Sequence, residues 1–284
     1  MSSGATVNAR TQVAAVIGSP VRHSLSPVIH NAAFAAHGDN WVYEAFDVVP
    51  EHAVAAIDAM RILGIAGMSI TMPHKELVMA ALDEVHPTAA MVRAVNTVMR
   101  VGDRLVGHNT DGVGCVDALR AAQADLTSVA VLGAGATARA VIAALVHEGA
   151  QVAVANRSAT RQSDAVALGN AVRANSTVAI GLHDAAQCAT IINTTPQGMA
   201  GVAQDSTPLE AESLAAHHTV LDAVYHPLET VFLRQARARG ARIVDGVSML
   251  CAQAARQQEL WLGRLPDVAL MRRAALEELA KSQQ

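Results

Sequence analysis

The sequence predicts an α/β protein of two domains, in which a doubly wound parallel sheet is inserted into an α/β domain that the C-terminal helices complete. Three observations predict this fold class. Short apolar runs alternate with helical patterns along most of the chain, a β-branched run at 129–132 ends in a glycine turn, and two amphipathic helical stretches without a further strand follow residue 246. We therefore expect one domain from residues 1–110 together with 246–284, and a second from residues 111–245.

The stretch VAVLGAGATAR at 129–139 has the strand–turn–helix context of a dinucleotide-binding loop. Gly133 allows a tight turn, and Gly135 has no Cβ that would keep a pyrophosphate away from the backbone. Ala138 at the third position still permits close packing of helix on strand. The amides that open the next helix favour a negative group. An ordinary turn is the alternative, but the context favours a Rossmann domain that binds a nucleotide through Gly133, Ala134, Gly135 and Ala136.

The first 110 residues alternate between strand and helix signals, which favours a largely parallel sheet. Ser26 and Pro27 predict the N-cap and the first residue of one helix. Pro73 is expected to open another helix, with Lys75 in its first turn, where the helix dipole disfavours a solvated cation. The expected strands are 12–18, 41–48 and 66–71, the expected helices are 26–37, 50–63 and one from 73, and a hairpin over 95–108 with its turn at Gly102 and Asp103 precedes a helix after Asp111.

The central part of the chain predicts the six strands of a doubly wound sheet, with helical stretches between most of them. Two amphipathic helices at 248–262 and 266–281 follow, and we expect them to pack back onto the N-terminal domain. The six expected strands are 129–132, 151–155, 177–180, 190–193, 220–224 and 242–244.

Composition excludes several classes of function. The chain is 51% hydrophobic but only 2% aromatic and carries a formal net charge of -4, so neither base stacking nor general nucleic-acid binding is expected. Residues 1–12 have no apolar core and read as a flexible lead-in rather than a signal peptide, and no apolar run is long enough to cross a bilayer. Three distant cysteines and twelve histidines without metal-binding spacing predict neither disulfides nor a metal site. We expect a cytoplasmic protein, monomeric or homodimeric, with a small-molecule ligand.

Polar side chains gather on the predicted loops. Ser24 and Ser26 are two residues apart, as are Ser69 and Thr71 at a strand end, so each pair points to one side. Each also has an ordinary structural alternative: Ser26 and Asp111 as helix caps, Asn96 as a turn residue, and Lys75 as a surface lysine. Together, Ser, Thr, Lys, Asn and Asp on loops suit a small polyhydroxylated ligand.

The second strand of the central domain bears on the choice of nucleotide. An NAD enzyme usually ends this strand with an acid that accepts a hydrogen bond from the ribose 2′-hydroxyl. Here the strand ends at Asn156 and Arg157, with Arg161 one turn later. Two guanidinium groups suit a 2′-phosphate, so the sequence favours NADP over the alternative of two surface arginines.

Nine segments, in their order and spacing, resemble the shikimate dehydrogenases along nearly the whole chain: HSLSP, SITMPHK, AVNT, HNTDG, VLGAGATARA, ANRSATR, NTTPQGM, DAVYHPLETVFL and DGVSMLCAQAA. The resemblance implies an NADP-dependent enzyme that reduces 3-dehydroshikimate to shikimate, reversibly, in the route to aromatic amino acids. Lys75 and Asp111 match the catalytic pair: hydride delivered to the C3 carbonyl leaves an alkoxide, which a lysine ammonium can protonate while the carboxylate positions it.

The resemblance also implies which residues bind the ligands. Residues matching the substrate site are Ser24, Ser26, Thr71, Asn96, Tyr225 and Gln253. Residues matching the NADP site, besides the glycine turn and the two arginines, are Asn156, Ser158, Thr194, Met199, Val224, Gly246 and Met249.

Three positions depart from the usual family pattern near the expected substrate. Ser69 stands where Asn is frequent, and Arg93 and Ser248 stand where Gly is frequent. These departures leave two alternatives open: a quinate/shikimate or related ring-hydroxy-acid dehydrogenase of relaxed specificity, and a non-catalytic dinucleotide-binding sensor. The presence of both Lys75 and Asp111 argues against the sensor, which needs no proton donor.

Overall fold

A computed structural model describes residues 7–281, which form two compact units. The terminal unit contains the described residues up to Thr110 and those from Ala254 onward, and the central unit contains Asp111–Gln253. The second boundary falls inside helix α8 (Gly246–Leu262) rather than before it, where the sequence analysis placed it. Residues 1–6 of the expected lead-in lie outside the described part of the chain.

The terminal unit is built on a mixed sheet. Within the described residues its six strands run in the order β2-β1-β3-β5-β6-β4. β1 pairs in parallel with β2 and β3, whereas β3–β5 and β5–β6 are antiparallel. The predicted hairpin accounts for this mixture: β5 and β6 are joined at Gly102, whose φ of 60° suits a tight turn. The strands are β1 (Gln12–Gly18), β2 (Trp41–Asp47), β3 (Gly67–Ile70), β4 (Glu84–Val85), β5 (Thr97–Val101) and β6 (Arg104–His108).

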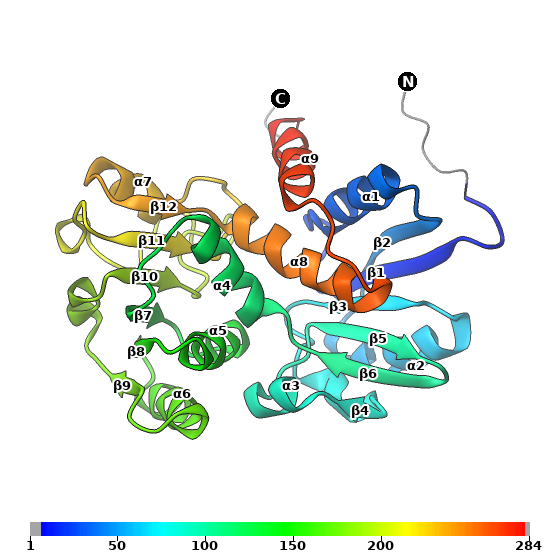
Figure 1. Cartoon of the computed structure of the whole chain (residues 1–284), viewed down its shortest axis with the longest axis horizontal. Helices are drawn as coiled ribbons and strands as arrows, with labels where there is room; N and C mark the ends of the chain where they lie inside the picture. The colour runs from blue at the N-terminus through cyan, green and yellow to red at the C-terminus, as the bar shows by residue number, and fades with distance from the viewer. Residues whose placement is uncertain (1–6, 282–284) are drawn as a thin grey trace. The chain divides into compact units, whose positions relative to one another are not determined.

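Helices cover both faces of this sheet. α2 (Ala53–Leu63) packs on one face through Ile57 and Met60. On the other, α1 (Ser26–His37) lies beside α9 (Val268–Lys281), as Figure 1 shows. The end of α8 also packs here: a Cβ at Gly67 would come within 2.5 Å of the Trp261 indole. An Arg264–Asp39 ion pair ties the segment after α8 to the end of α1. The C-terminal helices therefore complete the core of the terminal unit.

Two local predictions are wrong. Leu25, not Ser26, is the N-cap residue of α1, and Ser26 is its first helical residue; the Ser24 hydroxyl accepts a hydrogen bond from the Ser26 amide. Residues 72–76 form turns that lead into a 3₁₀ helix, η2 (Leu77–Ala81), instead of a helix opened by Pro73. The Lys75 carbonyl accepts from the amide of Val95, 2.8 Å away, so the segment before β5 takes the acceptor that a helix would have used. The helix-dipole argument for Lys75 therefore does not hold.

The central unit is a doubly wound sheet. Its described strands are all parallel and run in the order β12-β11-β10-β7-β8-β9, so the strand order reverses between β7 and β10. This is the Rossmann strand order. The strands are β7 (Ser128–Leu132), β8 (Gln151–Ala155), β9 (Thr177–Ala179), β10 (Thr190–Asn193), β11 (Thr219–Asp222) and β12 (Arg242–Val244).

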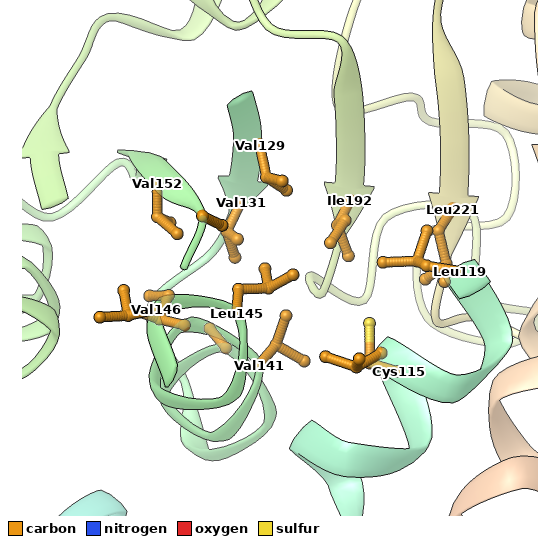
Figure 2. Packing of buried hydrophobic residues seen from close by; sticks show 14 of the residues in the cluster. Cys115, Leu119, Val129, Val131, Val141, Leu145, Val146, Val152, Ile192 and Leu221 are labelled. Atoms are coloured by element: carbon orange, nitrogen blue, oxygen red, sulfur yellow. The ribbon is translucent and has the colours of Figure 1, made fainter. Parts of the chain in front are cut away.

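Side-chain alternation along β7 sends residues to two separate cores. Val129 and Val131 pack with α4 (Asp111–Ala121) and α5 (Ala136–His147), as Figure 2 shows. Ala130 and Leu132 point to the opposite face, where α7 (Val231–Ala238) covers the sheet. The remaining described helices are α3 (Pro87–Val92) and the 3₁₀ helix η1 (Pro50–His52) in the terminal unit, and α6 (Ala159–Val172), η3 (Leu182–Gln187) and η4 (Ala211–Ser213) in the central unit.

No helix in the part of the chain that the structure describes is long and apolar enough to span a membrane. Cys115, Cys188 and Cys251 are free thiols in buried positions.

Candidate active site

The glycine turn after β7 has the backbone that a phosphate site requires. Gly133 has φ of 118°, and a Cβ there would lie 2.5 Å from the Thr194 hydroxyl, so only glycine fits. Gly135 is the N-cap residue of α5, and a Cβ built on it meets no atom within 4 Å. The first turn of α5 carries no acidic side chain. The open space and the positive end of the helix together fit a dinucleotide phosphate.

One predicted cofactor residue, Thr194, lies against this turn, and two others, Val224 and Gly246, meet at the next strand end. The Thr194 hydroxyl donates to the Leu132 carbonyl at 2.8 Å, which holds the loop after β10 against the glycine turn. Because the strand order reverses between β7 and β10, this is the crevice position where doubly wound sheets bind ligands. At the next strand end, a Cβ on Gly246 would lie 2.4 Å from the Val224 carbonyl, so the start of α8 meets the loop after β11.

The predicted 2′-phosphate residues follow β8. The Gly133 amide donates to the carbonyl of Ala155 at 2.9 Å, which places Asn156 directly after a residue bonded to the glycine turn. The Asn156 side chain donates to the Ser158 carbonyl, and the Ser158 hydroxyl caps α6 by accepting from the Arg161 amide. Arg157 and Arg161 are exposed, so their guanidinium groups can reach an anion in solvent.

In the terminal unit, two predicted substrate residues, Thr71 and Asn96, lie next to the ends of the neighbouring strands β3 and β5. Thr71 follows β3, where its methyl group lies so close to Gly18 that a Cβ there would be 2.3 Å away. The Asn96 side chain accepts from the Thr97 hydroxyl and the Thr110 amide and donates to the Thr110 hydroxyl, at 2.7–3.0 Å. Asn96 is therefore held in one orientation, and it fixes the residue that precedes Asp111.

Lys75 and Asp111 belong to different units. Lys75 is half-buried in the turn after β3 and is tied through its carbonyl to Val95, the neighbour of Asn96. Asp111 is the first residue of α4, and 6% of its surface is exposed. Burial raises the pKa of the Cys115 thiol one turn along α4, and the negative charge of Asp111 raises it further. An ammonium and a carboxylate are groups able to exchange and orient a proton.

A buried polar network that the sequence motifs do not predict lies beside Asn96. The Tyr43 hydroxyl donates to the Ser69 hydroxyl at 2.6 Å, and the Ser69 hydroxyl donates to the Gln257 side chain at 2.8 Å. The Gln257 amide in turn donates to the Asn96 carbonyl at 3.2 Å. Burial raises the pKa of the Tyr43 phenol, although hydrogen bonds with Ser69 and Ser26 oppose the rise. No motif could reveal this network, because its members come from positions 43, 69, 96 and 257.

The other predicted residues lie in loops and helices of the central unit. Burial raises the pKa of the Tyr225 phenol, which follows β11. The Gln253 side chain bonds within its own helix, to the carbonyl of Leu250, and the Gln253 backbone lies against Gly114 of α4. Ser248 bonds to Asp245 at the start of the same helix. Met199 is half-buried in the loop after β10, and Met249 is buried in α8.

Among residues 7–281, no group of three or more His, Cys, Asp or Glu side chains is arranged to hold a metal ion.

Comparison with known proteins places these features in one family. Residues 16–98 match the family described as the shikimate dehydrogenase substrate binding domain, and residues 246–276 match the shikimate 5'-dehydrogenase C-terminal domain. The chain is 43% identical to the shikimate dehydrogenase (NADP(+)) of Symbiobacterium thermophilum, over 94% of this chain and 95% of that protein.

Solved structures agree with this placement. The shikimate 5-dehydrogenase of Thermus thermophilus, in complex with NADP(H) and shikimate, is 37% identical with a TM-score of 0.88, covering 94% of this chain and 99% of that one. The quinate dehydrogenase of Corynebacterium glutamicum, in complex with NAD, is 32% identical with a TM-score of 0.85, covering 94% and 99%. Family match, near full-length identity and fold together show that the chain belongs to the shikimate dehydrogenase family.

Proposed function

We propose that this protein catalyses the reversible NADPH-dependent reduction of 3-dehydroshikimate to shikimate. The observation that carries the proposal is the glycine turn at the reversal of the strand order, in a chain 43% identical to an NADP-dependent shikimate dehydrogenase. The turn leaves open space at Gly135 and begins a helix without acidic residues in its first turn. These features suit a dinucleotide and have no use in a purely structural turn.

NADP is the cofactor that the residues fit. The Gly133–Ala136 amides would hold its pyrophosphate, and Arg157 and Arg161 would hold the 2′-phosphate. Thr194, Met199, Val224, Gly246 and Met249 would line the rest of the dinucleotide, with Asn156 and Ser158 shaping the arginine-bearing loop. When bound, the cofactor supplies the hydride.

Lys75 and Asp111 are the proposed catalytic pair. The Lys75 ammonium donates a proton to the oxygen of the substrate carbonyl as this oxygen gains negative charge. Asp111 positions that ammonium. Two hydrogen bonds support the pairing: the Val95 amide holds the carbonyl of Lys75, and the Asn96 side chain holds the amide of Thr110, directly before Asp111.

Most of the residues proposed to bind the substrate belong to the terminal unit, and the residues proposed to bind the cofactor belong to the central unit. Oxygen and nitrogen atoms of Ser24, Ser26, Thr71, Asn96, Tyr225 and Gln253 would bind the hydroxyl groups and the carboxylate of the ring acid. The rigid attachment of Asn96 supports this, because a fixed amide discriminates one arrangement of hydroxyl groups from another. We propose that the protein acts as a monomer or a homodimer.

A quinate or related ring-acid dehydrogenase is the second candidate. The Ser69 hydroxyl donates to Gln257 and accepts from Tyr43, so its one proton is committed within the protein. A subsite without that donor rejects alternative ring acids less strictly. Similarity to the Corynebacterium glutamicum quinate dehydrogenase also favours this candidate.

One assay tests both candidates. NADPH or NADH formation is followed at about 340 nm with shikimate and quinate offered separately, each with NADP and with NAD. We expect the highest kcat/KM with shikimate and NADP. A higher kcat/KM with quinate would select the second candidate, a higher value with NAD would contradict the cofactor assignment, and no turnover with either acid would contradict the proposed function.

A further inference from the structure

Asp222, the last residue of β11, is a carboxylate with no exposed surface. Three donors from three places in the chain converge on it. The Asn193 side chain donates to Oδ1 at 2.9 Å, the Val224 amide donates to Oδ1 at 3.1 Å, and the Thr230 hydroxyl donates to Oδ2 at 2.6 Å. Burial raises the pKa of Asp222 to about 6, and these donors oppose the rise.

Asn193 extends this cluster into the loop after β10. Its Oδ1 accepts from the Thr195 amide at 3.0 Å and from the Thr195 hydroxyl at 2.7 Å, and its Nδ2 also donates to the Gln197 carbonyl. Gly198, with φ of 89°, lies so close to Thr230 that an added Cβ would be 3.1 Å from the Thr230 side chain. The loop after β10 is therefore bonded to Asp222 and packed against the start of α7.

Thr230 completes the cluster on the other side. Its hydroxyl accepts from the Leu233 amide at 3.2 Å, which caps α7, while its proton goes to Asp222. Val224 begins the loop after β11, and the Ala200 amide donates to the His226 carbonyl at 2.9 Å. Two loops from neighbouring strand ends are thus joined at one buried carboxylate and at one backbone hydrogen bond.

We propose that Asp222 is a positioning residue for cofactor binding, which sets the loops 193–199 and 223–230 against each other so that they present one surface to the dinucleotide. This inference rests on the proposed function, since Thr194, Met199, Val224 and Tyr225 lie in these loops. The two loops follow β10 and β11, on the side of the strand-order reversal where Thr194 meets the glycine turn.

The chemistry of the cluster suits positioning better than stability. A buried carboxylate loses its hydration, and an apolar side chain of similar volume often serves the fold as well. What a carboxylate adds is two acceptor atoms that take several donors at once in fixed directions. Here those donors come from positions 193, 224 and 230, so one side chain aligns three segments.

The test compares Asp222→Ala with a control on the same strand as Asn193. Thr190 is fully buried at the opposite end of β10, where its hydroxyl donates to the Asp125 carbonyl, so Thr190→Val removes a buried hydrogen bond away from the loops. Dissociation constants for NADPH are measured by fluorescence titration of the full chain, with KM for shikimate and Tm alongside. We expect Asp222→Ala to weaken NADPH binding about tenfold or more, with a smaller change in KM for shikimate, because Tyr225 is the one proposed substrate residue in these loops. Thr190→Val should lower Tm but leave NADPH binding unchanged.

Conservative variants separate positioning from folding. Asp222→Asn keeps an oxygen for Asn193 and Val224 and can donate to the Thr230 hydroxyl, so it should retain most of the affinity. Thr230→Ser should bind NADPH as wild type does, whereas Thr230→Val should bind it more weakly. If Asp222→Ala does not fold, the comparison of these two variants tests the inference.

Equal NADPH affinity in Asp222→Ala and wild type would overturn the inference, as would equal losses in Asp222→Ala and Thr190→Val. Unchanged affinity in Thr230→Val would also overturn it. A wild-type protein that binds no NADPH would instead contradict the proposed function, so the two failures are distinguishable.

Discussion

Lys75 is the residue on which the proposed chemistry depends most directly. It lies in a turn, and its backbone is bonded to the segment before β5 rather than within a helix. The tie to Val95 holds the main chain, so a change of the Lys75 side chain should leave the local backbone in place.

Truncation of Lys75 should therefore affect chemistry and not folding. We expect Lys75→Ala to lower kcat by about 10²–10⁴-fold, the usual contribution of a proton-transfer group, with little change in KM or Tm. Steady-state kinetics and thermal unfolding measure these quantities. The other lysine of the sequence, Lys281, pairs with Glu278 on the exposed face of α9 and provides the control as Lys281→Ala. Near-normal turnover in Lys75→Ala would refute the assignment.

Asp222 predicts a pH dependence of stability. Its folded pKa is raised from 3.8 to about 6, so its contribution to stability is fully present below about pH 4 and is lost as pH rises through about 6. The shift corresponds to about 3 kcal/mol between these limits. Asp222→Asn has no such group, so the Tm of wild type relative to this variant should fall as pH increases from about 4 to 7. A Tm difference that stays constant with pH would contradict the raised pKa.

At the scale of the element, the glycine turn shapes the proposed site because two of its residues have no side chain. Gly133 and Gly135 are two residues apart but differ in their constraints. Gly133 needs a positive φ and has Thr194 against it, whereas Gly135 has φ of -78° and open space around it. The fold requires the first glycine, whereas the second leaves open space that we propose a ligand fills.

This difference predicts unequal effects on stability. Gly135→Ala should change stability by less than about 1 kcal/mol, because alanine adopts this φ without strain but is a poorer N-cap residue than glycine, yet it should weaken NADPH binding at least about tenfold. Gly133→Ala should weaken binding and also lower stability by about 1–3 kcal/mol. Thermal unfolding and NADPH titration of both variants measure the contrast. Equal Tm values for the two variants would contradict it.

At the scale of the whole molecule, the chain begins and ends in the same unit. α9 packs on α1, and Met271, Ala275 and Leu279 of α9 are buried. Both tryptophans of the sequence, Trp41 and Trp261, belong to this terminal unit. Tryptophan fluorescence, excited where tyrosine does not absorb, therefore reports the unfolding of the terminal unit separately from the central one.

A substitution that weakens the packing of α9 on α1 should shift the unfolding transition detected by tryptophan fluorescence. We expect Met271→Ala to lower the stability of the fluorescence-detected transition by about 2–5 kcal/mol, the cost of a cavity at a buried methionine. At temperatures below this unfolding transition, the affinity for NADPH should remain unchanged, since the proposed cofactor residues lie in the central unit. Ile62→Ala on α2, where the side chain is 82% exposed, is the control and should change stability by less than about 0.5 kcal/mol. An equal effect of the two substitutions would show that α9 does not stabilise the unit.

The sequence predicted most strands and helices because their signals are local. Alternating apolar residues, the β-branched run before Gly133 and the turn at Gly102 are each readable within a few residues. It also predicted the doubly wound central sheet and the family, because the motif order persists along the chain. The Pro73 helix was wrong because a hydrogen bond from Val95 outweighed a local propensity.

By itself, the sequence determined most element types and the glycine turn, since these depend on neighbours along the chain, and its motifs supplied the candidate residues through the family resemblance. Tertiary structure alone decided that Tyr43, Ser69 and Gln257 share one hydrogen-bond chain, and that Asp222 collects donors from positions 193, 224 and 230. The physical reason is that a buried polar group takes whichever partner the packed fold brings within about 3 Å. That partner is set by sheet order and helix packing, and no local pattern encodes it.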